Sequence, residues 1–171
     1  MGGDDLDPDL VDLCRREHVR LVGLLALYTG DRPVAEDLAQ EALLRLHDRW
    51  DQVRAMPSPR AWLSAVAINL ARSWWRRRYA EQRAYRRHGA APVSEPAAEP
   101  ADVLAVRRAV AALPLRQRAA LVLRYYGGLS LGETAAALRC ADGTVKSLTH
   151  KAIARLRADL DDAEREEIPH A

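Results

Sequence analysis

Residues 129–157 read LSLGETAAALRCADGTVKSLTHKAIARLR, and this stretch decides the fold class of the chain. Ser130 followed by Glu133 has the pattern of a capping box, which predicts that a helix starts at this point. The CADG segment breaks that helix, and Asp142 is placed to cap a second helix from Thr144. Two short helices joined by a tight turn form a helix-turn-helix, which predicts DNA binding.

The predicted second helix has one apolar face and one polar face. Steps of four, three and four residues place these side chains on the apolar face: Val145, Thr149, Ala152 and Leu156. The polar face and its edges carry the candidate contacts to duplex DNA: Thr144, Lys146, Ser147, His150, Lys151 and Arg155. Donor side chains on the exposed face of such a helix suit the reading of base edges in the major groove. The alternative is a helical hairpin whose basic face is only solvated.

The composition favours helices and shows a strong segregation of charge. Hydrophobic residues make up 49% of the 171 residues, but many are Ala or Leu and none is Phe, which favours small helical bundles over sheets. The net charge is only +2, yet residues 72–88 hold seven arginines and one glutamate, whereas residues 159–167 hold six acids and one arginine. A local basic stripe attracts nucleic acid even when the total charge is near neutral. The acidic segment either screens a basic face in the free protein or is a solvated helix end.

We predict an all-α chain with two small helical domains joined by a flexible linker. The expected parts are a first domain at residues 10–87, a linker at 88–101, a helix-turn-helix domain at 102–160 and an acidic tail at 161–171. The expected helices span about residues 10–27, 33–50 and 60–87 in the first domain, with a loop at 51–59, and residues 103–113 and 115–126 before the helix-turn-helix. Three prolines and many small residues make the linker extended and flexible.

The predicted helix at residues 33–50 has an acidic outward face. Its inward stripe is Ala35, Leu38, Ala39, Ala42, Leu46 and Trp50. The side chains that point elsewhere are Asp37, Gln40, Glu41 and Leu44. Without other motifs, an ordinary solvated helix face and a docking surface for a basic partner explain this pattern equally well.

Aromatic and basic residues alternate along the end of the predicted helix at residues 60–87. Two turns contain Arg72, Trp74, Trp75, Arg76, Arg77, Arg78 and Tyr79. Two adjacent tryptophans cannot both face one core, because neighbours on a helix differ by about 100°. Aromatic faces beside guanidinium groups suit unpaired bases and a phosphate backbone. The alternative is that one tryptophan packs inward and the arginines are solvated.

Five short motifs, in this order and spacing, resemble a known family. They are AEDLAQEA at 35–42, AWL at 61–63, INLAR at 68–72, LP followed by QR at 113–118, and GTVKS at 143–147. Together they are similar to the bacterial extracytoplasmic-function (group IV) RNA polymerase sigma factors over about residues 10–160. The helix-turn-helix alone occurs in many regulators, but the acidic-helix motif and the terminal motif together in one short chain are much more specific.

The resemblance implies a division of labour. It assigns Asp37, Gln40, Glu41 and Leu44 to docking on the β′ clamp helices of core RNA polymerase, and the second domain to the β flap. It assigns the loop at 51–59 with Asn69, Arg72, Trp74, Trp75, Arg76 and Arg77 to opening the minus-ten element, where a non-template base is flipped out. Lys146, Ser147 and Lys151 match positions that contact the minus-thirty-five duplex, whereas His150 and Arg155 are further candidates. An anti-sigma factor is a further expected partner.

One departure from the family lies in the recognition helix. Leu148 and Thr149 stand where the family usually has Arg followed by an apolar residue. Leu148 therefore removes a DNA contact, and Thr149 makes the buried stripe less apolar. We expect weaker or altered recognition at the minus-thirty-five element. Asn69 also has a purely structural alternative, as a capping or helix-surface amide.

The sequence speaks against other classes of protein. The two cysteines and five histidines match no metal spacing, and neither a Gly-rich phosphate loop nor a nucleophile–base pattern is present, so we expect no catalytic residues, metal or cofactor. The N-terminus lacks the apolar core of a signal peptide, and no stretch approaches the roughly 18 apolar residues of a membrane span, so we expect a cytoplasmic protein. Two alternatives stay open: a stand-alone helix-turn-helix regulator, and an inactive sigma-like protein that only holds core polymerase.

Overall fold

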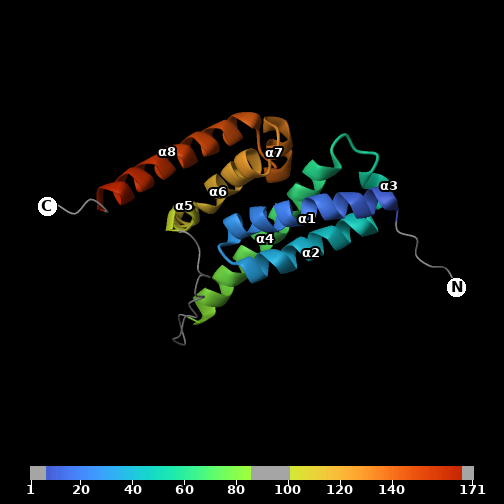
Figure 1. The fold of residues 1–171 in the computed structure, drawn as a ribbon, viewed down its shortest axis with the longest axis horizontal. Helices are drawn as coiled ribbons and strands as arrows, with labels where there is room; N and C mark the ends of the chain where they lie inside the picture. Colours follow the sequence, from blue (N-terminus) through green and yellow to red (C-terminus); the bar gives the residue numbers. More distant parts are fainter. Residues whose placement is uncertain (1–6, 86–100, 167–171) are drawn as a thin grey trace.

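The computed structural model of the chain describes residues 7–85 and 101–166. Its elements are α1 (Pro8–Thr29), α2 (Arg32–Asp48), α3 (Trp50–Val53), α4 (Pro59–Tyr85), α5 (Ala101–Ala112), α6 (Leu115–Leu121), the π-helical turn η1 (Val122–Tyr126), α7 (Leu131–Leu138) and α8 (Asp142–Glu166) (Figure 1). No strand occurs within the described ranges, which confirms the all-α prediction. The predicted linker lies outside the described residues, except that Ala101 already begins α5.

Helices α1–α4 form the first domain around a leucine-rich core. Asp7 caps α1, and Gly30 ends it in the left-handed conformation with φ of 77°. Asp31 then caps α2 by accepting a hydrogen bond from the Val34 amide at 3.1 Å, so the turn between the two helices is very short. Fully buried side chains from three of the helices form the centre of this core: Leu21, Leu24, Leu25, Leu46, Leu63 and Ile68.

The predicted helix at 33–50 and the predicted loop at 51–59 both need correction. Helix α2 ends at Asp48, and a short helix, α3, occupies the first part of the expected loop. The indole nitrogen of Trp50 donates to Asp7 Oδ2 at 2.8 Å, and Arg54 binds the same oxygen at 2.9 Å. This tertiary contact turns Trp50 toward the start of α1, and a helical periodicity cannot predict it.

Helices α5–α8 form the second domain, and the helix-turn-helix is present as α7 and α8. The capping box is confirmed, since Ser130 accepts from the Glu133 amide and the Glu133 carboxylate accepts from the Ser130 amide. The predicted role of Asp142 as a cap is wrong, because α8 starts at Asp142 itself and the Thr144 amide bonds to the carbonyl of Ala141. In the first turn the Asp142 carboxylate still favours the helix through the macrodipole.

The helix predicted at 115–126 changes its form near its end. Helix α6 stops at Leu121 and continues as the π-helical turn η1, whose wider hydrogen bond runs from the Gly127 amide to the Val122 carbonyl at 2.8 Å. The Leu129 amide then bonds to the Leu123 carbonyl at 3.1 Å. These bonds bring the Gly127 carbonyl to the surface of the second domain that faces the first domain.

Arg139 ends α7 with φ of 53°, in the left-handed conformation that a side chain disfavours. We expect Arg139→Gly to raise the free energy of unfolding by about 1 kcal/mol, because glycine adopts this conformation without steric cost. Thermal unfolding of the full chain checks this. Arg139→Ala is the matched control, since it removes the same side chain but keeps the Cβ; equal stability of the two variants would contradict the argument.

The two domains pack directly against each other. Helix α7 lies on α4, and α5, α6 and η1 contact α1 (Figure 1). Helix α8 lies along the side of the second domain that is away from α1 and α2 (Figure 1). None of the helices in the described part of the chain is long and apolar enough to cross a membrane.

Candidate nucleic-acid and polymerase interfaces

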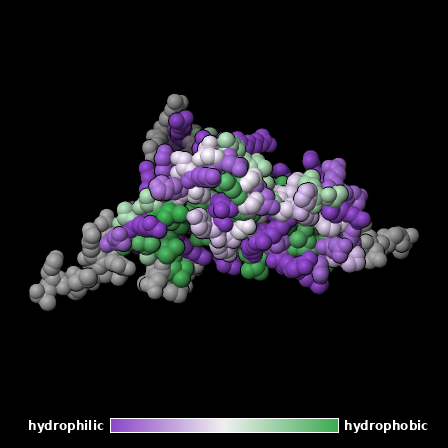
Figure 2. Space-filling view, turned by 90° about the horizontal axis from the view of Figure 1, so that it is seen from above, coloured by the Kyte–Doolittle hydropathy of each residue, from purple (hydrophilic) through white to green (hydrophobic). Residues whose placement is uncertain are grey.

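The polar face of α8 is open to solvent. Its exposed side chains are Lys146, Ser147, His150, Lys151 and Arg155, whereas Thr144 is half-buried. On the opposite face Val145 and Ala152 are fully buried. Figure 2, which views the molecule from the side of α8, shows hydrophilic side chains over much of this face, with hydrophobic ones in smaller groups. The face can therefore approach DNA without any rearrangement of the helix.

The two positions that depart from the family pattern have structural explanations. Leu148 is half-buried and packs against the hydrophobic core, so it lies at the edge of the polar face rather than in its centre. Thr149 is also half-buried, and its hydroxyl donates to the Val145 carbonyl at 2.9 Å. The hydroxyl is thereby satisfied within the helix, so it does not disturb the buried stripe.

The acidic face of α2 is exposed, as predicted. The predicted inward stripe of this helix is buried, except that Trp50 is half-buried and lies beyond the end of α2. Asp37, Gln40, Glu41 and Leu44 are all solvent-exposed, and Leu44 has 60% of its surface accessible. Glu41 forms an ion pair with Arg45 one turn later, at 2.9 Å. Such a surface pair contributes only a few tenths of a kcal/mol, so a cationic partner can replace it.

The tryptophans of α4 lie in an aromatic cluster with neighbouring arginines. Trp74 and Trp75 meet edge to face with ring centroids 4.8 Å apart, and Trp75 stacks on Tyr79 at 5.3 Å. The guanidinium of Arg78 lies over the Trp74 ring at 5.2 Å. Both tryptophans are half-buried and both pack against the hydrophobic core, so the expectation that two adjacent tryptophans cannot both face one core is wrong.

The remaining candidates on α4 differ in exposure. Arg76 and Arg77 are exposed, whereas Asn69 and Arg72 are half-buried. Arg72 donates to the side-chain oxygen of Asn69 at 3.4 Å, which makes the amide part of a polar row on the helix surface. Within the described part of the chain, the side-chain nitrogen of Asn69 forms no hydrogen bond, so it can donate to a bound partner.

Two family models match this chain, one for each domain. The family model described as "Sigma-70 region 2" matches residues 13–81, and the one described as "Sigma-70, region 4" matches residues 104–156. The chain is 39% identical over 127 residues to an RNA polymerase sigma-E factor of Streptomyces avermitilis, covering 74% of this chain and 71% of the relative. It is 35% identical over 144 residues to the ECF RNA polymerase sigma factor SigM of Mycobacterium tuberculosis, covering 84% and 73%.

The chain belongs to the sigma-70 family, in its extracytoplasmic-function group. This sigma factor directs RNA polymerase to specific promoters and so starts transcription. It is an initiation factor, and its family is not one of enzymes. The match of both regions sets aside the interpretation as a stand-alone regulator.

A solved structure shares the arrangement of both domains. The sigma factor RpoE of Bartonella quintana, solved in complex with the anti-sigma factor NepR, superposes with a TM-score of 0.81 at 26% identity, covering 91% of this chain and 98% of that one. The sigma factor CnrH, solved with the cytosolic domain of CnrY, shares the fold at a TM-score of 0.65 and 22% identity.

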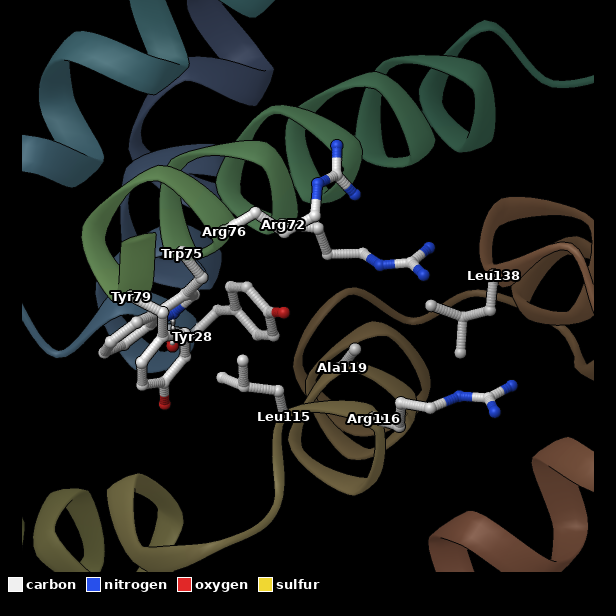
Figure 3. Close-up of a pocket in the computed structure, with 9 residues that line it drawn as sticks. All are labelled: Tyr28, Arg72, Trp75, Arg76, Tyr79, Leu115, Arg116, Ala119 and Leu138. Atoms are coloured by element: carbon white, nitrogen blue, oxygen red, sulfur yellow. Dashed lines mark hydrogen bonds between the residues drawn. The ribbon is translucent and has the colours of Figure 1, made fainter. Parts of the chain in front are cut away.

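A cleft of about 210 Å³ lies between the two domains of this sigma factor (Figure 3). Its lining residues are Tyr28, Arg72, Trp75, Arg76 and Tyr79 from the first domain and Leu115, Arg116, Ala119 and Leu138 from the second. A neighbouring cavity brings Asn69 and Arg72 together with Arg116 and Arg139. Several candidates for strand opening therefore face the second domain, which the sequence did not predict.

Arg118 belongs to the QR motif, but no role for its side chain could be predicted from the sequence. Only 6% of Arg118 is exposed, and burial lowers the pKa of its guanidinium. It donates to the carbonyls of Tyr28 at 2.8 Å and Leu113 at 3.1 Å, and also to that of Ala111. A buried arginine that reaches a carbonyl 90 residues away in sequence is a tertiary anchor, and no local pattern announces it.

Proposed function

We propose that three surfaces perform three separate tasks. The surface on α2 binds core polymerase, the surface on α4 opens the minus-ten element, and the surface on α8 recognises the minus-thirty-five duplex. Residues 10–87 bind core polymerase and the minus-ten region, residues 102–160 bind the minus-thirty-five region, and residues 88–101 connect them through the enzyme. The observation that carries this proposal is the chemical difference between the surfaces: α2 is acidic, α4 is aromatic and basic, and α8 presents donors on an exposed face. The acidic residues 161–171 have no assigned part in these tasks.

Helix α2 docks on the clamp helices of β′. An exposed carboxylate pair, Asp37 and Glu41, with Gln40 between them offers complementary charge and hydrogen bonds to a basic helix. Leu44, exposed one turn further on, supplies an apolar contact at the centre of the interface. The second domain makes its own contact with the β flap.

Helix α4 opens the minus-ten element. Flipping a base out of the duplex costs a few kcal/mol, and stacking on an aromatic side chain returns about 1–3 kcal/mol per base. Trp74, Trp75 and the surrounding arginines Arg72, Arg76 and Arg77 provide such stacking next to phosphate contacts. Asn69 supplies an amide for a base edge or a phosphate.

Helix α8 reads the minus-thirty-five duplex. Lys146, Ser147 and Lys151 face the base edges, whereas Thr144, His150 and Arg155 flank them and hold the phosphates. Leu148 stands where the family usually has an arginine, so recognition by this helix depends more heavily on Lys146 and Lys151.

An anti-sigma factor is the proposed regulatory partner. The support is the likeness to RpoE of Bartonella quintana, whose solved structure contains the anti-sigma factor NepR. Because its target polymerase is cytoplasmic, we place the sigma factor in the cytoplasm.

Transcription from duplex and premelted templates tests the assignment of α4. Promoter fragments are first selected from genomic DNA with the wild-type holoenzyme, and Trp74→Ala/Trp75→Ala is then compared with wild type. We expect a loss of about 10-fold or more on duplex templates, and near-wild-type output on templates with a preformed bubble, because only opening needs the stacking surface. Arg83→Ala, exposed further along α4, is the control. An equal loss on both templates, or none on either, would overturn this role.

A further inference from the structure

We propose that the cleft between the two domains is a binding site for a nucleoside polyphosphate, with the phosphates at a cluster of arginines and the base at an aromatic end. The arginine cluster consists of Arg72, Arg76, Arg116 and Arg139. The site goes beyond transcription initiation, because its ligand is a small molecule. It does not depend on strand opening by α4, since two of the four arginines belong to the second domain.

The phosphate end is a cavity of about 400 Å³ beside the cleft. Arg72 and Arg76 reach it from α4, Arg116 from α6, and Arg139 from the end of α7. The other described lining residues are polar or apolar, and none of them is acidic. The two domains therefore direct positive charge into one cavity.

The arginine cluster has no counter-ion among the described residues. None of its four members takes part in the ion pairs that the described part of the chain forms. Arg72 donates to the neutral side chain of Asn69 at 3.4 Å, and Arg76 donates to that of Ser73 at 2.7 Å. Like charges that lie close together repel each other, and a bound anion removes this repulsion. The cluster is therefore suited to an anionic ligand.

The number of donors indicates a chain of phosphates rather than a single one. Each guanidinium carries five N–H donors in a planar fork that matches the oxygens of a phosphate. One phosphate group offers only three strong acceptor oxygens, so four arginines provide more donors and more charge than it can use. Three members of the cluster, Arg76, Arg116 and Arg139, are exposed, so a ligand can reach them in this arrangement of the domains.

The aromatic end lies in the adjoining cleft of about 210 Å³, which three of the arginines also line. Figure 3 shows the rings of Tyr28, Trp75 and Tyr79 at one end of this cleft, with the guanidinium groups toward the other. Tyr79 is 48% exposed, so its ring can stack on a flat base. A ligand that joins a flat aromatic base to a chain of phosphates matches this order of side chains.

The backbone of Arg139 independently indicates a role for its side chain. Arg139 has a φ of 53°, which glycine adopts without steric cost and a side chain disfavours. The fold alone would therefore be more stable with glycine at this position. A residue held in a disfavoured conformation is often retained for function, and a contact with a bound phosphate gives arginine such a function here.

Arg116→Ala and Arg139→Gly of the full chain test the site. Both change residues of the second domain to which no contact with DNA or polymerase is assigned. Arg139→Gly is expected to be more stable than wild type, so a loss of binding by this variant cannot come from unfolding. Arg108→Ala is the matched control, because Arg108 is an exposed arginine of the same domain that lines neither cavity.

Isothermal titration calorimetry measures the binding of ATP, inorganic tripolyphosphate and a single-stranded oligonucleotide. We expect wild type and Arg108→Ala to bind ATP equally, and Arg116→Ala and Arg139→Gly each to bind it about 10-fold or more weakly. Wild type is expected to bind tripolyphosphate at least about 5-fold more weakly than ATP, because tripolyphosphate has no base to stack. Strand binding is expected to change less than 3-fold in either variant.

Three results would overturn the proposal. Absence of ATP binding by wild type, or equal ATP binding by all four proteins, would remove the site. Equal affinity for tripolyphosphate and ATP would remove the base from the ligand. Equal losses of ATP and strand binding in the two variants would show that the arginines serve the phosphate backbone of a DNA strand and not a free nucleotide.

Discussion

A Gln40→Ala/Glu41→Arg variant of this sigma factor is expected to lose at least about 30-fold in affinity for core polymerase. Both side chains are exposed on α2, so the substitutions change the surface without disturbing the buried stripe below it. Reversing a charge at a complementary interface leaves the partner's cation unpaired against another cation, and such changes cost about 2–5 kcal/mol. Equilibrium binding to purified core polymerase measures the loss.

The control for this variant carries a similar change of charge elsewhere. Asp12→Arg lies on an exposed part of α1 and leaves the α2 face intact. Wild-type affinity for this control together with the loss for the α2 variant localises docking to α2. Equal losses for both variants would show that net charge, and not this face, governs binding.

Lys146→Glu in α8 is expected to reduce transcription from promoters that depend on the minus-thirty-five element by about 10- to 100-fold. Lys146 is fully on the exposed face, and a base contact of this kind is worth about 1–3 kcal/mol before the repulsion from phosphate is added. Binding of the holoenzyme to duplex promoters and transcript yield are the measurements. Docking on core polymerase through α2 stays unchanged, because Lys146 lies on α8, on the surface proposed to face DNA.

Arg157→Glu provides the comparison for this second variant. It makes the same reversal on an exposed position of α8 beyond the proposed contacts. We expect a much smaller effect for Arg157→Glu than for Lys146→Glu, and a loss of sequence discrimination only for Lys146→Glu. Equal effects would mean that α8 contributes general attraction to DNA and no base recognition.

The sequence predicted the helices well where a local signal specified them. The capping box at Ser130 and Glu133 fixes the start of α7 through two hydrogen bonds within four residues. The buried stripe of α2 follows from periodicity, because one face of a helix must lie against the core. Such signals are contained in a short segment and do not depend on the rest of the molecule.

The errors lie at the ends of helices. Trp50 lies beyond the end of α2, where its ring still packs against the core and its indole nitrogen donates to Asp7, 43 residues earlier. The π-helical end of α6 and the start of α8 at Asp142 were not predicted either, although the backbone hydrogen bonds that define them lie within a few residues. Aspartate is a common N-cap residue, so Asp142 was predicted to be a cap from its residue type alone.

The candidate surfaces could be predicted from residue chemistry, but their relation in space could not. The exposed faces of α2 and α8 follow from which residues are polar, and the structure confirms their exposure. The contact of Arg118 with Tyr28 and Trp75 joins segments on either side of the linker. Nothing in the composition of these segments shows that the two domains meet, so the packing of the domains required the structure.

The most direct test of the whole account is transcription of a genomic fragment library by purified core polymerase, with and without this protein. We predict that the protein produces transcripts from a limited set of start sites that share two upstream elements, and that Lys146→Glu and Trp74→Ala/Trp75→Ala each reduce these transcripts by about 10-fold or more. If the protein binds core polymerase but the transcripts do not differ from those of core polymerase alone, the proposed function is contradicted.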